Sequence, residues 1–456
     1  MDLSRIVKAY DIRGVVGEQL DAGTVREIGA ALARLLRAES TATTTVAVGY
    51  DMRDSSPELA AAFAEGVTGQ GLDVVDIGLA STDMLYYAAG ALGVPGAMFT
   101  ASHNPAKYNG IKLCRAGATP IGQDTGLEAI RRDVERAVEQ GVPAGPGGGT
   151  VTRRAMVADY AGYLRGLVDL TAIRPLRVVV DAGNGMGGFT VPEVLGGLPV
   201  DVVPLYFELD GTFPNHEANP LDPANLVGLQ KAVVAEGADL GLAFDGDADR
   251  CFVVDERGEP VSPSAITGLV AVRELAKSPG ATVIHNLITS KAVPEIVREH
   301  GGAPVRTRVG HSFIKQTMAE TGAVFGGEHS AHYYFKDFWK ADSGMLAALH
   351  VLAALGEQPQ PLSELMGVYE RYSASGEINS TVADQAAKVA EVRQTWGARP
   401  GVTFDELDGL TVFQPDGAWF NLRASNTEPL LRLNVEAADS AAVAALRDEV
   451  LALVRS

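Results

Sequence analysis

VPGAMFTASHNP, residues 94–105, places reactive side chains directly after an apolar run. Its apolar first half, residues 94–99, is typical of a buried strand, and Pro105 stops a strand or helix from continuing. The loop between them presents Ser102 beside His103. A small nucleophile with a titratable neighbour beyond a buried strand favours covalent catalysis. The alternative is a polar turn whose side chains bond only the backbone.

Strand and helix patterns alternate on both sides of this stretch. Strands are expected at 45–51 and 72–77, and helices at 24–37, from Ser56 onward and at 84–90. A Pro- and Gly-rich segment at 142–149 then marks a domain boundary.

The same order of elements begins twice more after that boundary. Expected strands occupy residues 178–181, 198–204 and 238–244, then 281–285, 304–308 and 323–325. Each of the three series ends in a loop rich in reactive side chains. Parallel sheets bind ligands beyond the carboxyl ends of their strands, so these loops are candidates for one cleft. Hairpin-like strands at 410–413 and 418–423 instead predict a C-terminal antiparallel α+β domain.

Composition excludes several classes of partner. The 456 residues suffice for three or four domains of about 100–200 residues each. With 38 Lys and Arg against 57 Asp and Glu, the net charge of −19 disfavours nucleic acid and anionic membranes. Cys114 and Cys251 form no disulfide framework, and no leader or long apolar run is apparent. A soluble cytoplasmic protein is expected.

The loop Asp245-Gly246-Asp247-Ala248-Asp249-Arg250 predicts a metal site. Crowded carboxylates need a cation between them, and oxygen ligands in a short open loop suit Mg²⁺ with a phosphate oxygen. A solvated acidic turn is the plain alternative. An EF-hand is disfavoured, because the following segment is strand-like.

Two further loops carry groups suited to a sugar phosphate. Residues 423–427, RASNT, combine a guanidinium, hydroxyls and an amide that match a phosphate dianion, although a capped turn explains them as well. Glu328, Ser330 and His332 alternate, so an extended segment would turn them to one side, toward sugar hydroxyls.

A competing motif lies at residues 183–188, GNGMGG. It satisfies the dinucleotide pattern G-x-G-x-x-G, and Asp201 lies at roughly the distance of a ribose-binding acid. A tight strand-to-helix turn in a glycine-rich chain accounts for it equally well.

Taken together, four loops resemble the signature loops of the α-D-phosphohexomutases, in the same order. They are TASHNP at 100–105, DGDADR at 245–250, GEHS at 327–330 and RASNT at 423–427. Within that family, the Glu328 and Ser330 loop resembles bacterial phosphomannomutases and phosphoglucomutases.

The resemblance implies an α/β fold of three similar mixed α/β domains and a C-terminal antiparallel α+β domain around a central cleft. The expected boundaries are 1–145 with the phosphoserine loop, 150–255 with the metal loop, 256–367 with the sugar-binding loop, and 368–456 with the phosphate-binding loop.

The resemblance also implies the roles of residues. Ser102 carries a phosphoryl group, and one Mg²⁺ is held by a phosphoserine oxygen with Asp245, Asp247 and Asp249. Residues for acid–base work are His332, which we favour, with Lys112 and Arg13 assisting, and His103. Substrate-binding residues are Tyr10, Arg250, Lys291, His311, Glu328, Ser330, Arg423, Ser425, Asn426, Thr427 and Arg432.

The activity expected from this resemblance is that of a phosphomannomutase, interconverting mannose 1-phosphate and mannose 6-phosphate through a hexose 1,6-bisphosphate, which also acts as activator. Phosphoglucomutase or dual activity stays open. Mannose and glucose differ at the C2 hydroxyl, and no residue in the sequence is an obvious contact for that group. More distant alternatives are a metal-dependent sugar phosphatase, a dinucleotide enzyme and a silent sugar-phosphate binder. A monomer or weak dimer is expected.

Overall fold

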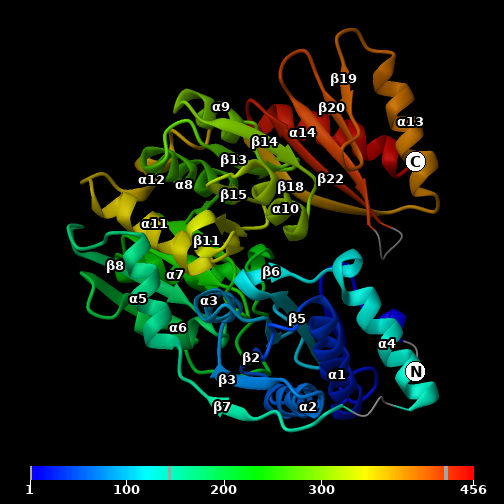
Figure 1. The fold of residues 1–456 in the computed structure, drawn as a ribbon. Coiled ribbons are helices and arrows are strands. Elements are labelled where there is room, and N and C mark those ends of the chain that lie inside the picture. Colours follow the sequence, from blue (N-terminus) through cyan, green and yellow to red (C-terminus); the bar gives the residue numbers. More distant parts are fainter. Residues whose placement is uncertain (1–2, 142–144, 426–429) are drawn as a thin grey trace. The chain divides into compact units, whose positions relative to one another are not determined.

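The computed structural model describes residues 3–141, 145–425 and 430–456, so Asn426 and Thr427 lie outside the described residues. The chain forms two compact units. The first contains Met1–Val261 and Ser330–Ser363, and the second contains Ser262–His329 and Glu364–Ser456. Figure 1 traces their elements along the sequence.

The first sheet carries the serine loop. Its strands are β1 (Ile12–Val15), β2 (Thr45–Tyr50), β3 (Asp73–Leu79), β4 (Gly96–Phe99), β5 (Tyr108–Arg115), β6 (Thr119–Pro120) and β7 (Val151–Arg153). They are ordered β1-β5-β4-β2-β3-β7, with β6 beside β5. β2 pairs in parallel with β3 and β4, whereas β5 runs antiparallel to β4. Ser102 therefore follows the third parallel strand, where the chain reverses.

The second sheet repeats this plan in the first unit. Its strands are β8 (Leu176–Asp181), β9 (Val200–Leu205), β10 (Leu240–Phe244), β11 (Cys251–Asp255) and β12 (Pro260–Val261). β8 pairs in parallel with β9 and β10, and β11 is antiparallel to β10. Asp245 thus follows the third parallel strand, as Ser102 does in the first sheet.

The third series begins in the second unit with β13 (Thr282–Asn286), β14 (Ala303–Thr307) and β15 (Phe325–Gly327). β13 again pairs in parallel with the other two, and Glu328 follows the third strand. In the first unit, β16 (Tyr333–Phe335) and β17 (Ala341–Asp342) form an antiparallel pair. The strand repeat expected from the sequence is therefore confirmed.

The C-terminal sheet is antiparallel, as predicted. Its strands are β18 (Ser373–Thr381), β19 (Thr403–Asp405), β20 (Leu410–Phe413), β21 (Trp419–Ala424) and β22 (Leu430–Ala437), ordered β18-β22-β21-β20-β19. β18 was not expected, because the segment is polar. It pairs with β22, and most of its side chains are exposed or half-buried.

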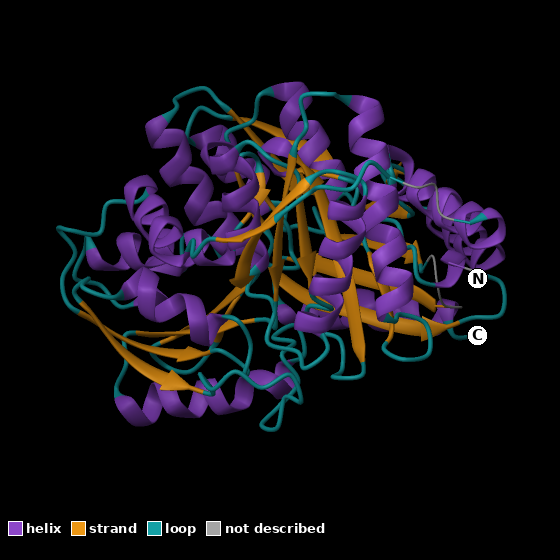
Figure 2. Ribbon diagram, turned by 60° about the horizontal axis from the view of Figure 1, so that its bottom comes forward, coloured by secondary structure: helices purple, strands orange, loops and turns teal. Residues whose placement is uncertain are grey.

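Helices cover these sheets (Figure 2). Those of the first unit are α1 (Ala22–Glu39), α2 (Ser56–Gly69), α3 (Thr82–Leu92), α4 (Leu127–Gln140), α5 (Val157–Leu167), α6 (Gly187–Leu195), α7 (Val227–Glu236) and α11 (Gly344–Gly356). Those of the second are α8 (Pro263–Lys277), α9 (Ala292–Glu299), α10 (His311–Thr321), α13 (Gln385–Gly397) and α14 (Ser440–Val454), while α12 (Leu362–Met366) lies where the units join in sequence.

Two strands extend sheets past the boundaries expected from the sequence. β7 pairs in parallel with β3, so the first sheet includes residues beyond 150. β12 pairs with β11, so the second sheet includes residues beyond 256. The Pro- and Gly-rich composition near residue 145 predicts a loop but does not show which sheet the next strand joins. Backbone pairing places that strand, β7, in the first sheet.

Among the described residues, no helix combines the length and apolar character needed to cross a membrane.

Helices α1 and α2 approach each other through two glycines. A Cβ placed on Gly29 would lie 2.3 Å from the carbonyl oxygen of Phe63, and one on Gly66 would lie 1.9 Å from that of Arg26. Both distances are far below van der Waals contact. The two helices can therefore pack at this spacing only because neither position carries a side chain.

We expect Gly66→Ala to destabilise the first unit by about 1–3 kcal/mol, because the helices must separate to accept the methyl group. Gly69→Ala, in the same helix, is the matched control, since its Cβ would meet nothing within 4 Å. Thermal unfolding followed by circular dichroism measures both. Equal midpoints for the two variants would show that the close approach does not limit stability.

Candidate active site

The Ser102 hydroxyl faces the aspartate loop. Its Oγ donates a hydrogen bond to Asp245 Oδ2 at 2.9 Å, and the residue is 5% exposed. Its φ of 50° lies in the left-handed region, which costs about 1–3 kcal/mol for a residue with a side chain. The surrounding contacts therefore hold the serine in a conformation that it would not adopt alone.

Asp245, Asp247 and Asp249 are all buried, with carboxylate oxygens within 4.8 Å of one another. Burial raises the pKa of Asp245 to about 7, although Arg250 opposes the shift. Burial also acts on Asp247, but Lys112 outweighs it and lowers the pKa of that carboxyl. Charge in this loop thus depends on the cations around it.

Lys112, on β5, joins two of the aspartates. Its Nζ lies 2.7 Å from Asp247 Oδ2 and 2.6 Å from Asp249 Oδ2. Burial lowers the pKa of Lys112, but the two carboxylates reverse that effect and raise it well above its ordinary value. The ammonium group is therefore charged throughout the neutral range.

The remaining oxygens of the loop fit a hard cation. Asp247 Oδ1 and Asp249 Oδ1 are buried and make no hydrogen bond to any described residue. Buried anionic oxygens without donors are costly, and an all-oxygen set with open positions suits Mg²⁺. The residues present therefore fit the expected metal.

His103 is neutral at this site. Arg250 Nη2 donates to His103 Nδ1 at 2.7 Å, and the same guanidinium donates to Asp245 Oδ2. Burial, followed by the charges of Arg250 and Arg13, lowers the pKa of His103 to about 3. Ser102 Oγ lies 3.2 Å from His103 Nδ1. Because that nitrogen accepts from Arg250, the imidazole is poorly placed to take the Ser102 proton.

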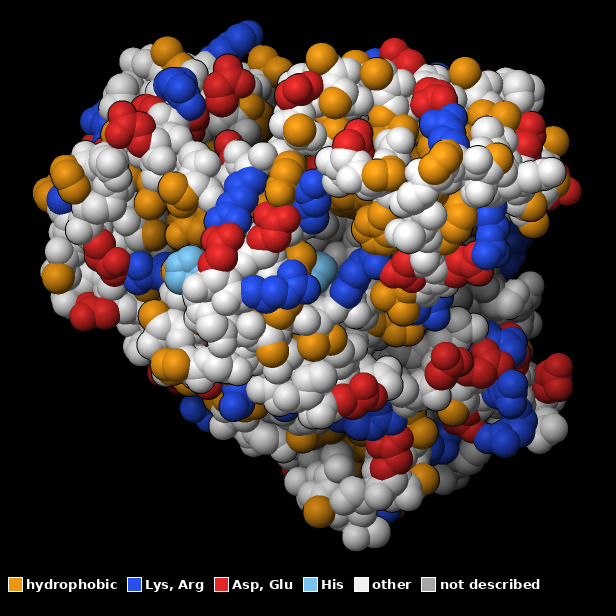
Figure 3. All heavy atoms as spheres, turned by 90° about the horizontal axis from the view of Figure 1, so that it is seen from above, with side chains coloured by type: hydrophobic (Ala, Val, Ile, Leu, Met, Phe, Trp, Pro, Cys, Tyr) orange, Lys and Arg blue, Asp and Glu red, His pale blue; other side chains and the backbone are white. Residues whose placement is uncertain are grey.

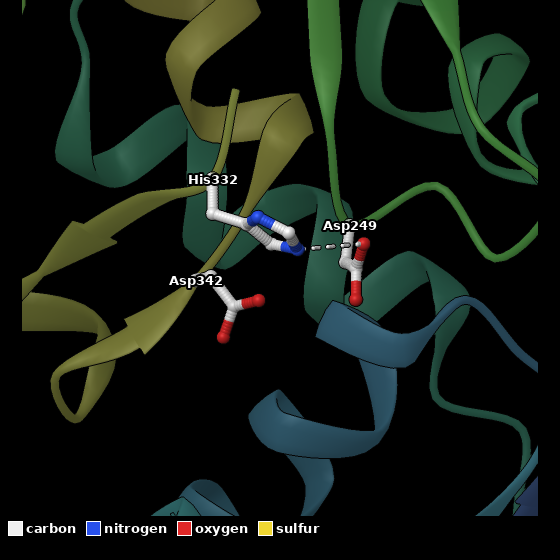
Figure 4. A group of neighbouring side chains, drawn as sticks. All are labelled: Asp249, His332 and Asp342. Carbon is white, nitrogen blue, oxygen red and sulfur yellow. Dashed lines mark ion pairs between the residues drawn. The ribbon is translucent and has the colours of Figure 1, made fainter. Parts of the chain in front are cut away.

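His332 points into the aspartate cluster from the chain before β16 (Figure 4). Its Nε2 lies 3.8 Å from Asp249 Oδ1, and Asp342 lies beside the ring. Ser330 Oγ is 3.0 Å from His332 Nδ1. The segment is not extended as expected, because residues 329–330 form a turn and Ala331 has a φ of 65°.

The N-terminus of α3 joins the aspartate loop to two other elements. Thr82 Oγ1 donates to Asp247 Oδ2 at 2.6 Å, and the Thr82 backbone N–H donates to the Asp247 carbonyl. The neighbouring Asp83 is fully buried and accepts from Tyr160 OH at 2.7 Å and Ser343 Oγ at 2.6 Å, and also from Ser81. Sequence reasoning missed both residues.

Arg13 and Tyr10 lie at the start of the first sheet. Arg13, on β1, donates to Asn104 Oδ1 at 2.7 Å and pairs with Asp11 at 2.5 Å. Tyr10 lies in the bend before that strand. Arg13 is thus tied directly to the serine loop.

In the second unit, two expected binding residues are already engaged. Glu328 is buried, and its Oε1 accepts from Asn286 Nδ2 at 3.1 Å and from the Gly310 N–H at 3.2 Å. Lys291 Nζ donates to the Gly417 carbonyl at 2.6 Å and lies 3.9 Å from the centre of the Tyr372 ring. His311 is the first residue of α10.

The arginines of the C-terminal sheet pair with acidic neighbours. Arg423 lies 3.6 Å from Glu377 and 3.5 Å from Asp408, and Arg432 lies 3.4 Å from Glu377. These separations are longer than the roughly 2.7–3.2 Å of a normal N–H···O hydrogen bond, so both guanidinium groups retain hydrogen-bonding capacity for an anion. The Ser425 N–H donates to the Leu430 carbonyl.

The glycines of residues 183–188 shape a contact with the aspartate loop. The Met186 N–H donates to the Gly246 carbonyl at 2.9 Å, and a Cβ on Gly185 would lie 2.7 Å from the same oxygen. Asp201 pairs with Arg177 on an exposed surface. Tight packing therefore accounts for the motif that had suggested a dinucleotide site.

Comparison with known families agrees with this geometry along nearly the whole chain. Residues 4–140, 158–258 and 262–372 match phosphoglucomutase/phosphomannomutase alpha/beta/alpha domains I, II and III, and residues 377–453 match the C-terminal domain. The chain belongs to the phosphoglucomutase/phosphomannomutase family. The predicted fold class, with three mixed α/β domains and a C-terminal antiparallel α+β domain, is confirmed.

Individual members of this family are similar over most of their length. A phosphomannomutase of Salmonella typhimurium is 42% identical over 442 residues, covering 94% of each chain. A phosphomannomutase/phosphoglucomutase of Pseudomonas aeruginosa is 39% identical, covering 95% of this chain and 91% of its own. A solved family member from Burkholderia thailandensis has a TM-score of 0.89 and 33% identity, covering 100% of this chain and 98% of that structure.

The buried carboxyl group of Asp83 should make the free energy of unfolding of this phosphohexomutase depend on pH. Burial raises the pKa of Asp83 to about 6 from an ordinary 3.8, despite its hydroxyl donors. The folded protein thus holds this proton to higher pH than the unfolded chain. Stability relative to Asp83→Asn should fall as pH rises from about 4 to 6, by up to about 3 kcal/mol.

Urea unfolding with a chelator present, at several pH values from 4 to 7, measures this difference. Because the asparagine variant lacks the titrating group, other ionisations cancel between the two proteins. A stability difference that is constant across the range would contradict the assignment of the raised pKa to Asp83.

Proposed function

We propose that this phosphohexomutase interconverts mannose 1-phosphate and mannose 6-phosphate through a phosphoserine at Ser102. The observation that carries the proposal is the 2.9 Å approach of Ser102 Oγ to the buried aspartate loop. Several relatives over nearly the full length are phosphomannomutases, including those of Salmonella typhimurium and Vibrio cholerae.

The aspartate loop and a phosphorylated Ser102 would together hold one Mg²⁺. A phosphoserine adds about −1.5 to −2 charge at neutral pH, beside three buried carboxylates. When bound, Mg²⁺ neutralises part of that charge and supports the negative charge of the transferring phosphoryl group. The proposed ligands are Ser102, Asp245, Asp247 and Asp249.

Transfer requires a balanced exchange of bonds. A sugar hydroxyl oxygen bonds to phosphorus while the bond from phosphorus to Ser102 Oγ breaks, and the hydroxyl proton leaves to a base. The resulting hexose 1,6-bisphosphate then returns its other phosphoryl group to Ser102, leaving the isomeric product. Added hexose 1,6-bisphosphate would activate the enzyme by phosphorylating Ser102.

His332 is the proposed acid–base group. Its ring is half-buried, and its Nε2 lies 3.8 Å from Asp249 Oδ1, which places an imidazole beside the aspartate loop. Lys112 and Arg13 would assist through their charge, and Arg250 through its hold on Asp245. His103, neutral and engaged by Arg250, suits a supporting role better than proton transfer.

The remaining predicted residues are proposed to bind the sugar and its phosphates. Glu328 and Ser330 would read the sugar, and the arginines of the C-terminal sheet retain capacity for the non-reacting phosphate. The full proposed set is Tyr10, Arg250, Lys291, His311, Glu328, Ser330, Arg423, Ser425, Asn426, Thr427 and Arg432.

Dual activity on glucose and mannose phosphates is the second candidate. The Pseudomonas aeruginosa relative carries both activities in its name. A sugar phosphatase is less favoured, because hydrolysis needs no site that rebinds an intermediate.

Small hexose phosphates are the proposed partners, and not nucleic acid or membrane. The net charge is −19, and basic and acidic side chains are intermixed on the face drawn in Figure 3. A cytoplasmic monomer or weak dimer is proposed.

Ser102→Ala should abolish nearly all mutase turnover, because it removes the oxygen proposed to accept and return the phosphoryl group. Intact mass after incubation with hexose 1,6-bisphosphate should show one added phosphoryl group in the wild type and none in the variant. Ser40→Ala, an exposed serine after α1, is the control and should behave as wild type. Near-normal turnover by Ser102→Ala would overturn the phosphoserine mechanism.

Initial rates on mannose 1-phosphate and glucose 1-phosphate, measured in parallel with Mg²⁺ and a trace of hexose 1,6-bisphosphate, test the sugar preference. We expect the higher kcat/KM on mannose 1-phosphate. Comparable values would make the enzyme a dual phosphomannomutase/phosphoglucomutase, and inactivity on both would contradict the proposed function.

A further inference from the structure

Arg53 lies beneath the Ser102 loop, and both of its Nη atoms donate to backbone carbonyls of that loop. It follows β2, and its side chain is 1% exposed. Nη2 donates to the carbonyl oxygens of Ser102 at 2.8 Å and Asn104 at 2.7 Å, and Nη1 donates to those of Pro105 and Tyr108, both at 3.1 Å. Nε donates to Asp51 Oδ2 at 3.2 Å. A guanidinium has five N–H bonds, and each finds an acceptor.

We propose that Arg53 is a positioning residue that holds the Ser102 loop in its reactive conformation. The bond to the Ser102 carbonyl fixes the peptide that follows the residue with the left-handed φ of 50°. That conformation carries a strain of about 1–3 kcal/mol, so it persists only where neighbouring groups enforce it. Four carbonyls on one rigid planar group supply such enforcement.

The support of Arg53 is itself rigid. Asp51 Oδ1 accepts from the Arg53 N–H at 3.1 Å and from Ser56 Oγ at 2.6 Å. Asn109, at the far end of the loop, donates to Ser55 and Ser56, so both ends of the loop attach to one turn. The guanidinium also lies 5.1 Å from the centre of the Phe213 ring. Its position is therefore set before the substrate arrives.

The Ser102 carbonyl also contacts the aspartate loop. A Cβ on Gly246 would lie 2.4 Å from the Ser102 carbonyl oxygen, so this glycine permits the two loops to meet. A shift of the serine loop would therefore disturb both the Ser102 Oγ–Asp245 contact and the fit against Gly246. A displacement of about 1 Å at a reacting group costs on the order of 100-fold in rate.

The test compares Arg53→Lys with Arg165→Lys. Lysine keeps the charge but lacks the planar fork, so it cannot bind four carbonyls together. Arg165 is the matched control, because its Nη1 also donates to backbone carbonyls, those of Glu193, Val194 and Gly196, away from the serine loop. Mutase rates, intact mass and amide hydrogen exchange are measured on all proteins.

We expect Arg53→Lys to lower kcat by about 100-fold, with KM changed by less than about threefold, since the residue orders the nucleophile and touches no substrate. Phosphoryl transfer from hexose 1,6-bisphosphate to Ser102, measured by intact mass spectrometry, should slow by a similar factor. Faster amide exchange should be confined to the loop from Ser102 to Tyr108. Arg165→Lys should leave all three readouts at wild-type values.

The rate measurement rests on the proposed function, whereas amide hydrogen exchange tests the positioning role of Arg53 without it. Wild-type inactivity on hexose phosphates would contradict the proposed function, while exchange at the loop would still test Arg53. A kcat within about threefold of wild type with unchanged exchange overturns the positioning role. So does failure of both Arg53→Lys and Arg53→Met to fold, since Arg53 would then serve the core rather than the loop.

Discussion

The burial of three carboxylates in one short loop is the constraint on which this site depends. Asp245, Asp247 and Asp249 are at most 2% exposed, and like charges at this spacing cannot all remain ionised without compensation. Lys112, Arg250 and the hydroxyl of Thr82 supply it from the protein. These compensating groups come from β5, from the loop itself and from α3. The loop therefore keeps its charge only in the assembled first unit.

The repeated strand order explains how such groups meet. In the first and second sheets the reactive loop follows the third parallel strand, immediately before an antiparallel neighbour. The chain must turn sharply there, which accounts for the left-handed φ values of Ser102 and Ala248. The same turn after the third parallel strand therefore presents Ser102 in the first sheet and the aspartate loop in the second.

Much of this could be predicted from the sequence, because local patterns encode local structure. The buried strands, the loops after them and the antiparallel C-terminal hairpin are visible as apolar runs, acidic repeats and turn residues. Arg53, Thr82 and Asp83 were missed, because the contacts that tie them to the site reach residues more than 40 positions away, which no local pattern records. Strand β18 was missed because it is polar in sequence and its side chains are mostly exposed or half-buried, whereas its place in the sheet comes largely from backbone pairing with β22.

The contacts of Arg53 with the serine loop bear on which substitutions that loop can accept. Because its four loop acceptors are main-chain oxygens, the guanidinium does not distinguish which side chains the loop carries. Substitutions at exposed positions such as Ala106 and Lys107 leave the same carbonyls in place. The loop is therefore free to acquire new surface chemistry over evolutionary time, or in directed evolution, while its backbone path is inherited unchanged.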